Sequence, residues 1–356
     1  MFIHKLHLTN FKNHEKKSFD FDKEIIAFTG LNGVGKTNVL DAIYFLSIGK
    51  SYFSSTDKSA IRNGTDFFRL EMDIKNDDKH RVVITNQLGK RKQIAVDDAL
   101  YEKNSTHVGR FPVVVVSPND QVLITGGSEE RRRFMDQSLS QLNREYLQAL
   151  LKYNQALKQR NALLKNAEEK GLDKKLLSIY DDELCQQAEI IYAHRLAFFE
   201  DIQAYFKESF TALSEKDEGF KLRYVSQLGK RGLCDLLQEN LKRDIILRRT
   251  TQGIHKDDVK FEMSGQLIKD FGSQGQQKTF LIALKLTQFN FLKAHLKKVP
   301  LFIVDDIFDK LDPRRSKNLI EFLNMQQGQV FISHTSSDTF EELDDLPIQI
   351  IAIGDE

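Results

Sequence analysis

The chain contains no tryptophan, only two cysteines and only five prolines among its 356 residues. The two cysteines, Cys185 and Cys234, stand in no metal-ligand spacing, and a single pair is too few for a disulfide framework. They favour a reducing, cytoplasmic setting. No apolar run reaches the roughly 18 residues of a membrane-spanning helix, and the N-terminal segment lacks the apolar core of a signal peptide. These absences predict a protein that is neither membrane-embedded nor secreted through a standard signal.

An excess of charge of either sign is also missing. The 52 lysines and arginines nearly balance the 51 aspartates and glutamates, which leaves a net charge of +1. Because a DNA-binding protein usually carries a basic patch, any such patch here must be local. The 29 % charged and 40 % apolar residues are ordinary for a soluble globular protein, and the length allows two or three domains.

The order of strand-like and helix-like segments predicts an α/β domain assembled from both ends of the chain. Short strand-like runs such as "EIIAFTG" and "FPVVVVSPND" fill the first part. From Ser128 the apolar residues recur at helical spacing, Gly171 interrupts them, and a second helical run extends from about Lys174 to Phe210. Two antiparallel helices joined at Gly171 are expected. The predicted segments are an N-terminal part of the α/β domain at 1–127, an inserted helical arm at 128–249 and a C-terminal part at 250–356.

A phosphate-binding loop is the most specific motif. "GLNGVGKT" matches G-x-x-x-x-G-K-S/T, with a strand-like segment before it and a helix-like segment after it. The glycines let backbone N–H groups close around phosphate oxygens at the start of a helix. Lys36 is expected to reach the β- and γ-phosphates, and Thr37 to place its hydroxyl on Mg²⁺. The nucleotide-binding residues predicted from this motif are Gly30, Leu31, Asn32, Gly33, Val34, Gly35, Lys36 and Thr37.

Two adjacent carboxylates follow a second buried-strand pattern. In "LFIVDDIFDKLD", Asp305 and Asp306 come directly after four apolar residues. A parallel strand would carry both to its carboxyl end, beside the phosphate loop. Asp305 suits association with Mg²⁺, and Asp306 suits a base or a group that positions water. The alternative is a polar strand end that leads into a turn.

A polar, flexible turn precedes an apolar helix-like run in "DFGSQGQQKTFLIALKL", residues 270 to 286. Taken alone, it fits a solvated loop before a core helix. Ser273 and Gly275 could instead offer a hydroxyl and a backbone N–H to a phosphate at a helix start.

The order of these motifs resembles the ABC-type ATPases of the SMC-like group. The resemblance rests on the phosphate loop, "SQGQQ", "IVDDIFDKLDP" and "ISHT", and it extends over the whole chain through "LHLTNFKNHEKKSFDF", "GKTNVLDAIYFLSIGKSY", "SPNDQVLITGGSEERRRFMD" and "GIHKDDVKF". It implies an ABC-type ATPase head with an inserted helical arm. Where the family often has arginine the chain has Phe53, and where proline is usual it has Ile254.

The resemblance also implies roles for matched positions. Asp305 takes the Walker B role, Asp306 the place of the catalytic glutamate, and His334 that of the switch histidine. Gln121 is a candidate for the glutamine that senses Mg²⁺. The further nucleotide contacts implied are Lys12 near the nucleotide, Ser273, Gly275 and Gln277 of the signature, and Asp312 of the D-loop.

The family further implies a weak ATPase that uses ATP and Mg²⁺ in DNA repair. Two heads sandwich two ATP molecules, so that the signature acts on the partner's ATP in an ATP-dependent homodimer. The expected partners are double-stranded and gapped DNA, RecR- and RecO-type mediator proteins and a RecA-type recombinase.

Two dense basic clusters are the candidate DNA contacts, because lysine and arginine neutralise backbone phosphates without reading sequence. A solvated face with internal ion pairs is the alternative for each cluster. No aromatic platform for stacking single-stranded bases stands out, which favours duplex binding. The residues predicted to contact DNA are Arg131, Arg132, Arg133, Lys242 and Arg243.

Two other functions are alternatives to an ATP-gated DNA clamp. A transporter ATPase subunit would lack the long helical insertion and would keep its signature closer to the phosphate loop. A nuclease would need a further acidic or zinc-binding cluster, which the sequence does not offer. The N-terminal block and the helical arm favour the clamp.

Overall fold

The computed structural model describes residues 1–213, 219–307, 313–326, 328–337, 340 and 346–354. The chain forms two compact units. The first, called here the head unit, comprises Met1–Asp120, Ser209–Glu215 and Lys278–Glu356; the second, the arm unit, comprises Gln121–Glu208 and Lys216–Gln277. No helix among the described residues is both long and apolar enough to cross a membrane.

The head unit contains two sheets, which confirms the predicted α/β class. The antiparallel sheet has the order β2-β1-β4-β5-β6-β7 and comprises β1 (Phe2–Phe11), β2 (His14–Asp20), β4 (Phe67–Lys75), β5 (Lys79–Gln87), β6 (Gln93–Val96) and β7 (Ala99–Leu100). The other sheet has the order β14-β3-β13-β12-β8, and its strands are β3 (Ile25–Thr29), β8 (Val113–Val116), β12 (Leu301–Asp305), β13 (Val330–His334) and β14 (Ile348–Ala352). All its neighbouring strands pair in parallel.

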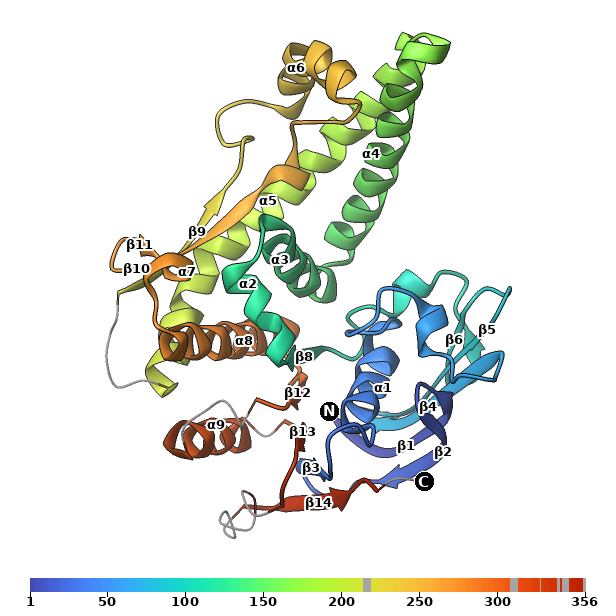
Figure 1. Ribbon diagram of the computed structural model, residues 1–356, viewed down its shortest axis with the longest axis vertical. Helices are drawn as coiled ribbons and strands as arrows, with labels where there is room; N and C mark the ends of the chain where they lie inside the picture. Colours follow the sequence, from blue (N-terminus) through green and yellow to red (C-terminus); the bar gives the residue numbers. More distant parts are fainter. Residues whose placement is uncertain (214–218, 308–312, 327, 338–339, 341–345, 355–356) are drawn as a thin grey trace. The chain divides into compact units, whose positions relative to one another are not determined.

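Helix α1 (Lys36–Ile48) lies between the two sheets and touches strands of both (Figure 1). Its apolar side chains are buried nearly all round, as expected of a helix enclosed by its own domain. Ile43 and Phe45 share one core cluster with Phe68 of β4 and Ile303 of β12. The phosphate loop at the start of α1 is therefore fixed by the central core of the head unit.

The parallel sheet is covered on its other face by α8 (Gln274–Leu296). Phe289 of α8 meets Phe302 of β12 edge to face, with ring centroids 5.5 Å apart. Leu301 and Ile303 belong instead to the cluster around α1, because side chains alternate across a strand. The remaining helix of this unit is α9 (Pro313–Met325), and its short 3₁₀ helices include η1 (Asp57–Ala60), η2 (Asn104–His107) and η3 (Pro118–Gln121), the last of which ends at the first residue of the arm unit.

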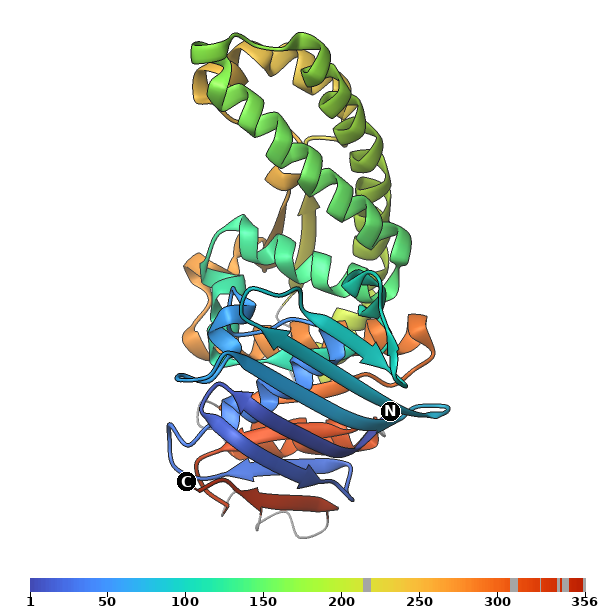
Figure 2. The same ribbon diagram turned by 90° about the vertical axis from the view of Figure 1, so that its right-hand side faces the viewer.

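The arm unit is built on long helices, and Figure 2 shows α4 and α5 side by side. Its elements are α2 (Val122–Thr125), α3 (Ser128–Leu142), α4 (Arg144–Lys170), α5 (Lys174–Leu213), α6 (Leu233–Leu247), η4 (Ile254–Lys256) and α7 (Ile268–Phe271). Contacts of Glu145 with His194 and of Arg160 with Asp181 establish the antiparallel pairing that the sequence predicted, with the connection at Gly171.

The first helical run is interrupted, contrary to expectation. At residue 143 the backbone is extended, and the Asn143 side chain accepts hydrogen bonds from the backbone N–H groups of Glu145 (2.8 Å) and Tyr146 (3.1 Å). An asparagine that caps two free N–H groups is a favoured helix start. The apolar spacing continues across this break, so periodicity alone could not reveal it.

The last part of the arm unit comes from a segment that the sequence predicts to belong to the C-terminal part of the head. Strand β10 (Asp258–Met263) pairs with β9 (Phe220–Val225) on one side and with β11 (Gln266–Leu267) on the other. Residues 250–277 thus belong to the compact arm unit, whereas the sequence places them in the C-terminal part of the head. Cys185 of α5 and Cys234 of α6 form a disulfide with Cα atoms 5.6 Å apart, a link that the low cysteine count did not predict.

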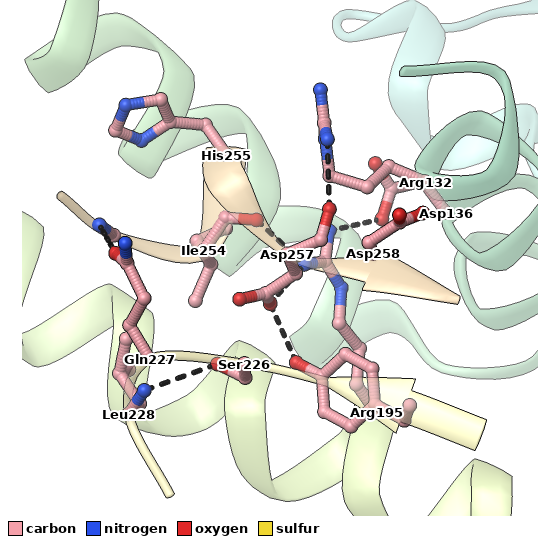
Figure 3. A network of polar contacts seen from close by, with 12 residues as sticks. Arg132, Asp136, Arg195, Ser226, Gln227, Leu228, Ile254, His255, Asp257 and Asp258 are labelled. Carbon is pink, nitrogen blue, oxygen red and sulfur yellow. Dashed lines mark hydrogen bonds and ion pairs between the residues drawn. The ribbon is translucent and has the colours of Figure 1, made fainter. Parts of the chain in front are cut away.

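A buried arginine joins α5 to the rest of the arm unit. The Arg195 guanidinium donates to Asp136 (2.8 Å) and Asp257 (2.7 Å), and its side chain is 1 % exposed (Figure 3). It also donates to the Ile254 main-chain oxygen at 2.9 Å and to the Tyr146 hydroxyl at 3.1 Å. Such a group holds α3, α5 and the start of β10 together at the cost of desolvating several charges.

Replacing Arg195 with methionine should destabilise the arm unit by about 3–5 kcal/mol, because the buried Asp257 and the partly buried Asp136 would lose their cation. Urea unfolding followed by the far-ultraviolet signal of the helices measures the effect. The matched control is Arg231→Met, which removes an exposed pair with Glu239 and should cost less than about 1 kcal/mol. Equal midpoints for the two variants would contradict the role assigned to Arg195.

Candidate nucleotide-binding site

The phosphate loop connects β3 to α1 in a conformation that depends on glycine. Gly30, Gly33 and Gly35 have φ angles of 144°, 92° and 102°. A Cβ atom at Gly30 would lie 2.3 Å from the Ile353 main-chain oxygen. No side chain caps the N-terminus of α1, so its first N–H groups are available to a ligand. The loop thus has the open, N–H-lined form that phosphate binding requires.

Lys36 folds back over this loop. Its Nζ atom donates to the main-chain oxygens of Gly30 (2.7 Å) and Leu31 (2.9 Å), and the residue is only 4 % exposed. A cation held at the phosphate loop by two carbonyl oxygens is suited to a negatively charged phosphate. Leu31 is 74 % exposed, so the outer rim of the loop faces solvent.

The turn between β1 and β2 clamps the phosphate loop, a role that the sequence did not reveal. Asn13 Nδ2 donates to the Val34 main-chain oxygen at 3.2 Å, and Asn38 Nδ2 donates to Asn13 Oδ1 at 2.7 Å. His14 Nε2 lies 3.1 Å from the Gly35 main-chain oxygen. A Cβ atom at Gly35 would come within 2.5 Å of the Asn13 side chain. The only signal in the sequence was that "NFKNH" belongs to the resembling N-terminal block, without a role for Asn13 or His14.

Lys12, predicted to lie near the nucleotide, is on this same turn and is paired with α1. Its Nζ atom lies 2.6 Å from Asp41 Oδ2, and Asp41 is fully buried. The same carboxylate accepts hydrogen bonds from the Ser51 hydroxyl and the Tyr52 backbone N–H. Lys12 Nζ also lies 5.6 Å from the centre of the Phe53 ring, within the range of a cation–π contact. Phe53, which replaces the arginine common in the resembling family, therefore packs against a neighbouring cation.

Asp305 meets the phosphate loop at the carboxyl edge of the parallel sheet, as predicted. Thr37 Oγ1 donates to Asp305 Oδ1 at 2.7 Å, and Ser333 Oγ donates to the same oxygen at 2.8 Å. Burial raises the pKa of Asp305; the bonds from Thr37 and Ser333 oppose this rise, and the nearby Asp306 adds to it. Ser333 was not predicted, but its register opposite Asp305 on the neighbouring strand places it there.

Asp306 leaves the strand in a left-handed backbone conformation, with φ of 44°. Its N–H donates to Ser333 Oγ at 3.0 Å. A non-glycine residue in this region is strained, and such strain tends to occur at functional sites. His334 ends β13 in register with Thr29, the last residue of β3, and is 5 % exposed. Asp305, Asp306 and His334 are therefore all near the strand ends that adjoin the loop.

The residues present fit a nucleotide and a magnesium ion. Mg²⁺ commonly takes one or two protein oxygens and completes its shell with phosphate oxygens and water. The Thr37 hydroxyl and the Asp305 carboxylate are such a pair, already in contact. Among the described residues, no cluster of three or more histidine, cysteine, aspartate or glutamate side chains is arranged to hold a metal ion.

The signature turn lies in the arm unit and forms a reciprocal helix cap. Ser273 Oγ accepts from the Gln276 N–H at 3.2 Å, while Gln276 Oε1 accepts from the Ser273 N–H at 2.9 Å. This is the capping-box arrangement. Ser273, Gln274 and Gly275 are exposed, so the helix start faces outward.

Gln121 contacts the signature segment within the arm unit. Its Nε2 donates to Gln277 Oε1 at 2.8 Å, and Gln277 Nε2 donates to the main-chain oxygens of Gly272 (3.1 Å) and Ile268 (3.3 Å). The two glutamines thus brace the turn that precedes α8. Asp312, assigned to the D-loop, lies outside the described residues.

The predicted DNA contacts differ in their surroundings. Arg131 is buried and donates to Asp258 (2.7 Å) and to the Gly126 main-chain oxygen (2.8 Å), which fits the alternative of internal ion pairs. Arg132 uses Nη1 for Ser128 Oγ and the Asp257 main-chain oxygen. The remaining candidates, Arg133, Lys242 and Arg243, are exposed.

The chain matches the family model described as the RecF/RecN/SMC N terminal domain over residues 2–352. It is 44 % identical over 346 residues to the DNA replication and repair protein RecF of Flavobacterium johnsoniae, covering 96 % of each chain. It is 42 % identical over 340 residues to the RecF protein of Cytophaga hutchinsonii, covering 95 % of this chain and 90 % of the relative.

Solved structures agree with these relationships. A structure described as the recombination mediator protein RecF-ATPrS in the RecFOR pathway matches with a TM-score of 0.89 and 25 % identity, covering 99 % of this chain and 96 % of the other. A RecF-ATP structure matches with a TM-score of 0.85 and 27 % identity, covering 94 % and 92 %. The Smc head domain of Pyrococcus furiosus, at 17 % identity and a TM-score of 0.56 over 99 % and 94 % of the chains, shows a shared fold.

Substituting Asp305 with asparagine should stabilise the free protein at neutral and alkaline pH. Because burial raises the pKa of Asp305 in the folded state, its ionised form opposes folding above that pKa. The advantage of the variant should shrink as the pH falls and vanish below the usual value of 3.8, where the carboxyl is neutral in both states. Urea midpoints measured from pH 8 downward test this, with the exposed turn residue Asp78→Asn as the control. A D305N variant less stable than the wild type at pH 8 would contradict the assignment.

Proposed function

Because the chain belongs to the RecF/RecN/SMC family, we propose that it is an ATP-dependent DNA-binding protein of recombinational repair and replication-fork maintenance. The observation that supports this most is the hydrogen bond between Thr37 Oγ1 and Asp305 Oδ1, which joins residues 268 positions apart at one sheet edge. It unites the two halves of a nucleotide site in the head unit.

ATP binding would use the phosphate loop as described. The N–H groups of residues 30 to 37 surround the phosphates, and Lys36 exchanges its contacts with Gly30 and Leu31 for phosphate oxygens. Thr37 and Asp305 would hold Mg²⁺, which neutralises phosphate charge when bound. The two RecF structures with ATP or ATPrS in their descriptions support this ligand for the present chain.

Hydrolysis would be slow and would depend on Asp306. Its carboxylate follows the Mg²⁺-associated Asp305 and is set by a strained backbone, so it can orient and deprotonate a water molecule. His334, at the end of the adjacent strand, would stabilise charge on the departing phosphate. An aspartate in place of the longer glutamate reaches less far, which accords with weak, DNA-stimulated turnover.

The signature would complete the ATP site of a second copy. Ser273 and Gly275 lie at an exposed helix start, where the Ser273 hydroxyl and the Gln276 side chain form the cap. Helix starts attract phosphate oxygens because the helix dipole is positive there, and a phosphate would take over the N–H groups that the cap now holds. ATP would thereby join two heads, and hydrolysis would release them.

This dimer would bind duplex DNA at single-strand gap junctions and assist recombinase loading with RecO- and RecR-type mediators. The description of the related RecF structure as a recombination mediator in the RecFOR pathway supports these partners. Arg133, Lys242 and Arg243 are exposed and suited to phosphate contacts.

The Lys36→Ala variant should lose ATP binding, because charged hydrogen bonds to phosphate contribute roughly 1.5–3 kcal/mol each. Isothermal titration calorimetry with ATP and Mg²⁺ measures the loss. The exposed turn lysine Lys90→Ala is the matched control and should bind as the wild type does. Micromolar affinity retained by K36A would refute the role of the loop.

The Ser273→Arg variant should bind ATP as a monomer but fail to dimerise, since its bulky cation would occupy the space of the partner's phosphate. Light scattering with and without ATP reports the mass. Ser273→Thr keeps the hydroxyl that caps Gln276 and should still dimerise. An ATP-dependent dimer of S273R would argue against the shared site.

A further inference from the structure

The segment "GIHKDD", residues 253 to 258, has no part in the nucleotide site, yet the arm unit holds it rigidly. The His255 ring bridges two elements: Nδ1 accepts from the Tyr153 hydroxyl of α4 at 2.7 Å, and Nε2 donates to the Thr250 main-chain oxygen at 3.2 Å. Burial lowers the pKa of His255 to about 4, so the ring is uncharged at physiological pH and keeps both hydrogen bonds.

Further contacts fix the same turn. The Asn161 side chain accepts from both the N–H and the hydroxyl of Thr250 at 2.7 Å. Gly253 has a φ angle of 129°, and a Cβ atom there would lie 2.4 Å from the Tyr153 hydroxyl. A turn with this many buried constraints presents its outward side chains in a defined arrangement.

Closing this turn brings cations together from separate parts of the chain. His255 contacts Thr250, so the flanking residues Lys256 and Arg249 are drawn toward each other, and both are exposed. From α3, Arg132 donates Nη1 to the Asp257 main-chain oxygen at 2.8 Å, next to Lys256 (Figure 3). Three cations therefore surround one short turn.

These cations make no direct ion pair among the described residues, although Glu129, Asp136 and Asp257 act on Arg132 and Asp244 acts on Lys256 from further away. Among the described residues no carboxylate lies within ion-pair distance of Arg132, Arg249 or Lys256, while the neighbouring Asp257 is occupied by Arg195. Arg132 engages only its Nη1 atom within the described part of the chain, which leaves Nε and Nη2 for a ligand. Its guanidinium is held in place by Ser128 and by the backbone, as expected of a preorganised anion-binding group.

The pKa of Lys256 also reflects the mutual repulsion of these cations. The pKa of Lys256 is lowered, first by burial and then by the nearness of Arg249 and Arg132, with Asp244 opposing the change. Groups of like charge that depress one another's pKa gain from a bound anion. A phosphate satisfies several N–H donors at once, and guanidinium groups match its geometry.

We infer that Arg132, Arg249 and Lys256 form a phosphate-binding site on the arm unit that takes the backbone of duplex DNA. The site adds a DNA contact to those of the proposed function and rests on that function only for the identity of the ligand. It reads no sequence, because it offers cations to phosphates and presents no group arranged for base edges. It also explains why the buried Arg195 network lies directly beneath the turn: that network holds the backbone from which two of the three cations are positioned.

The double variant Arg249→Gln/Lys256→Gln tests the site, since neither side chain makes a hydrogen bond or ion pair within the described residues. Fluorescence anisotropy with a labelled 24-base-pair duplex, in ATP and Mg²⁺, gives the salt dependence of binding. Two lost phosphate contacts should lower the slope of log affinity against log salt by about 1.8. The control Lys75→Gln/Lys79→Gln removes the same charge from two lysines paired across a hairpin of the head unit and should change the slope little. Equal effects of the two double variants, or no effect of the first, would overturn the inference.

A second measurement on the wild-type chain separates this site from the proposed function. Acetylation of Lys256 is followed by mass spectrometry with duplex, inorganic pyrophosphate or poly-glutamate, and Lys79 is the internal reference. Protection of Lys256 by duplex and pyrophosphate supports the site. If pyrophosphate protects Lys256 but the protein binds no duplex, the phosphate site stands and the DNA-binding function is refuted. Protection by poly-glutamate alone would overturn the phosphate site in favour of an acidic protein partner, and no protection by any probe would overturn it outright.

Discussion

The site depends on the parallel pairing of β3, β13 and β12, because that pairing brings three carboxyl ends to one edge. Thr29 leads into the phosphate loop, His334 stands in register beside it, and Asp305 is paired with Ser333 one strand further. A shift of one residue in the pairing of β12 with β13 would turn Asp305 to the opposite face. The buried strands and the enclosed helix α1 prevent such a shift, since each strand is apolar on both faces and packs on both sides.

The sequence was sufficient for the parts of the site whose chemistry is local. A phosphate loop needs its glycines, lysine and threonine at fixed spacing, so "GLNGVGKT" could be identified from spacing alone. The four apolar residues before Asp305 predicted a buried strand that ends at this carboxylate. The clamp on the loop could not be found in this way. Asn13 and His14 act on residues about twenty positions away through side-chain contacts that no periodic pattern records, and Ser333 acts through strand register.

The arm shows the same division between local and distant effects. The spacing of apolar residues predicted long helices and the turn at Gly171, but the break at Asn143 depends on a cap and leaves the apolar stripe intact. The basic run at residues 131–133 predicted DNA contacts as a block. In the fold its three arginines separate, because one faces Asp258, one is anchored at the Asp257 backbone, and one is exposed. Successive residues of a helix point to different faces, so the basic run alone could not show which arginines reach the surface.

The central claim is that each ATP site is shared between two copies of the chain. The most direct measurement mixes K36A and S273R proteins and compares the ATPase rate of the mixture with the rate of each variant alone. In a mixed dimer, the intact phosphate loop of the S273R chain faces the intact signature of the K36A chain. The shared-site account predicts that two inactive proteins regain ATPase activity on mixing. A mixture no more active than its components would contradict it.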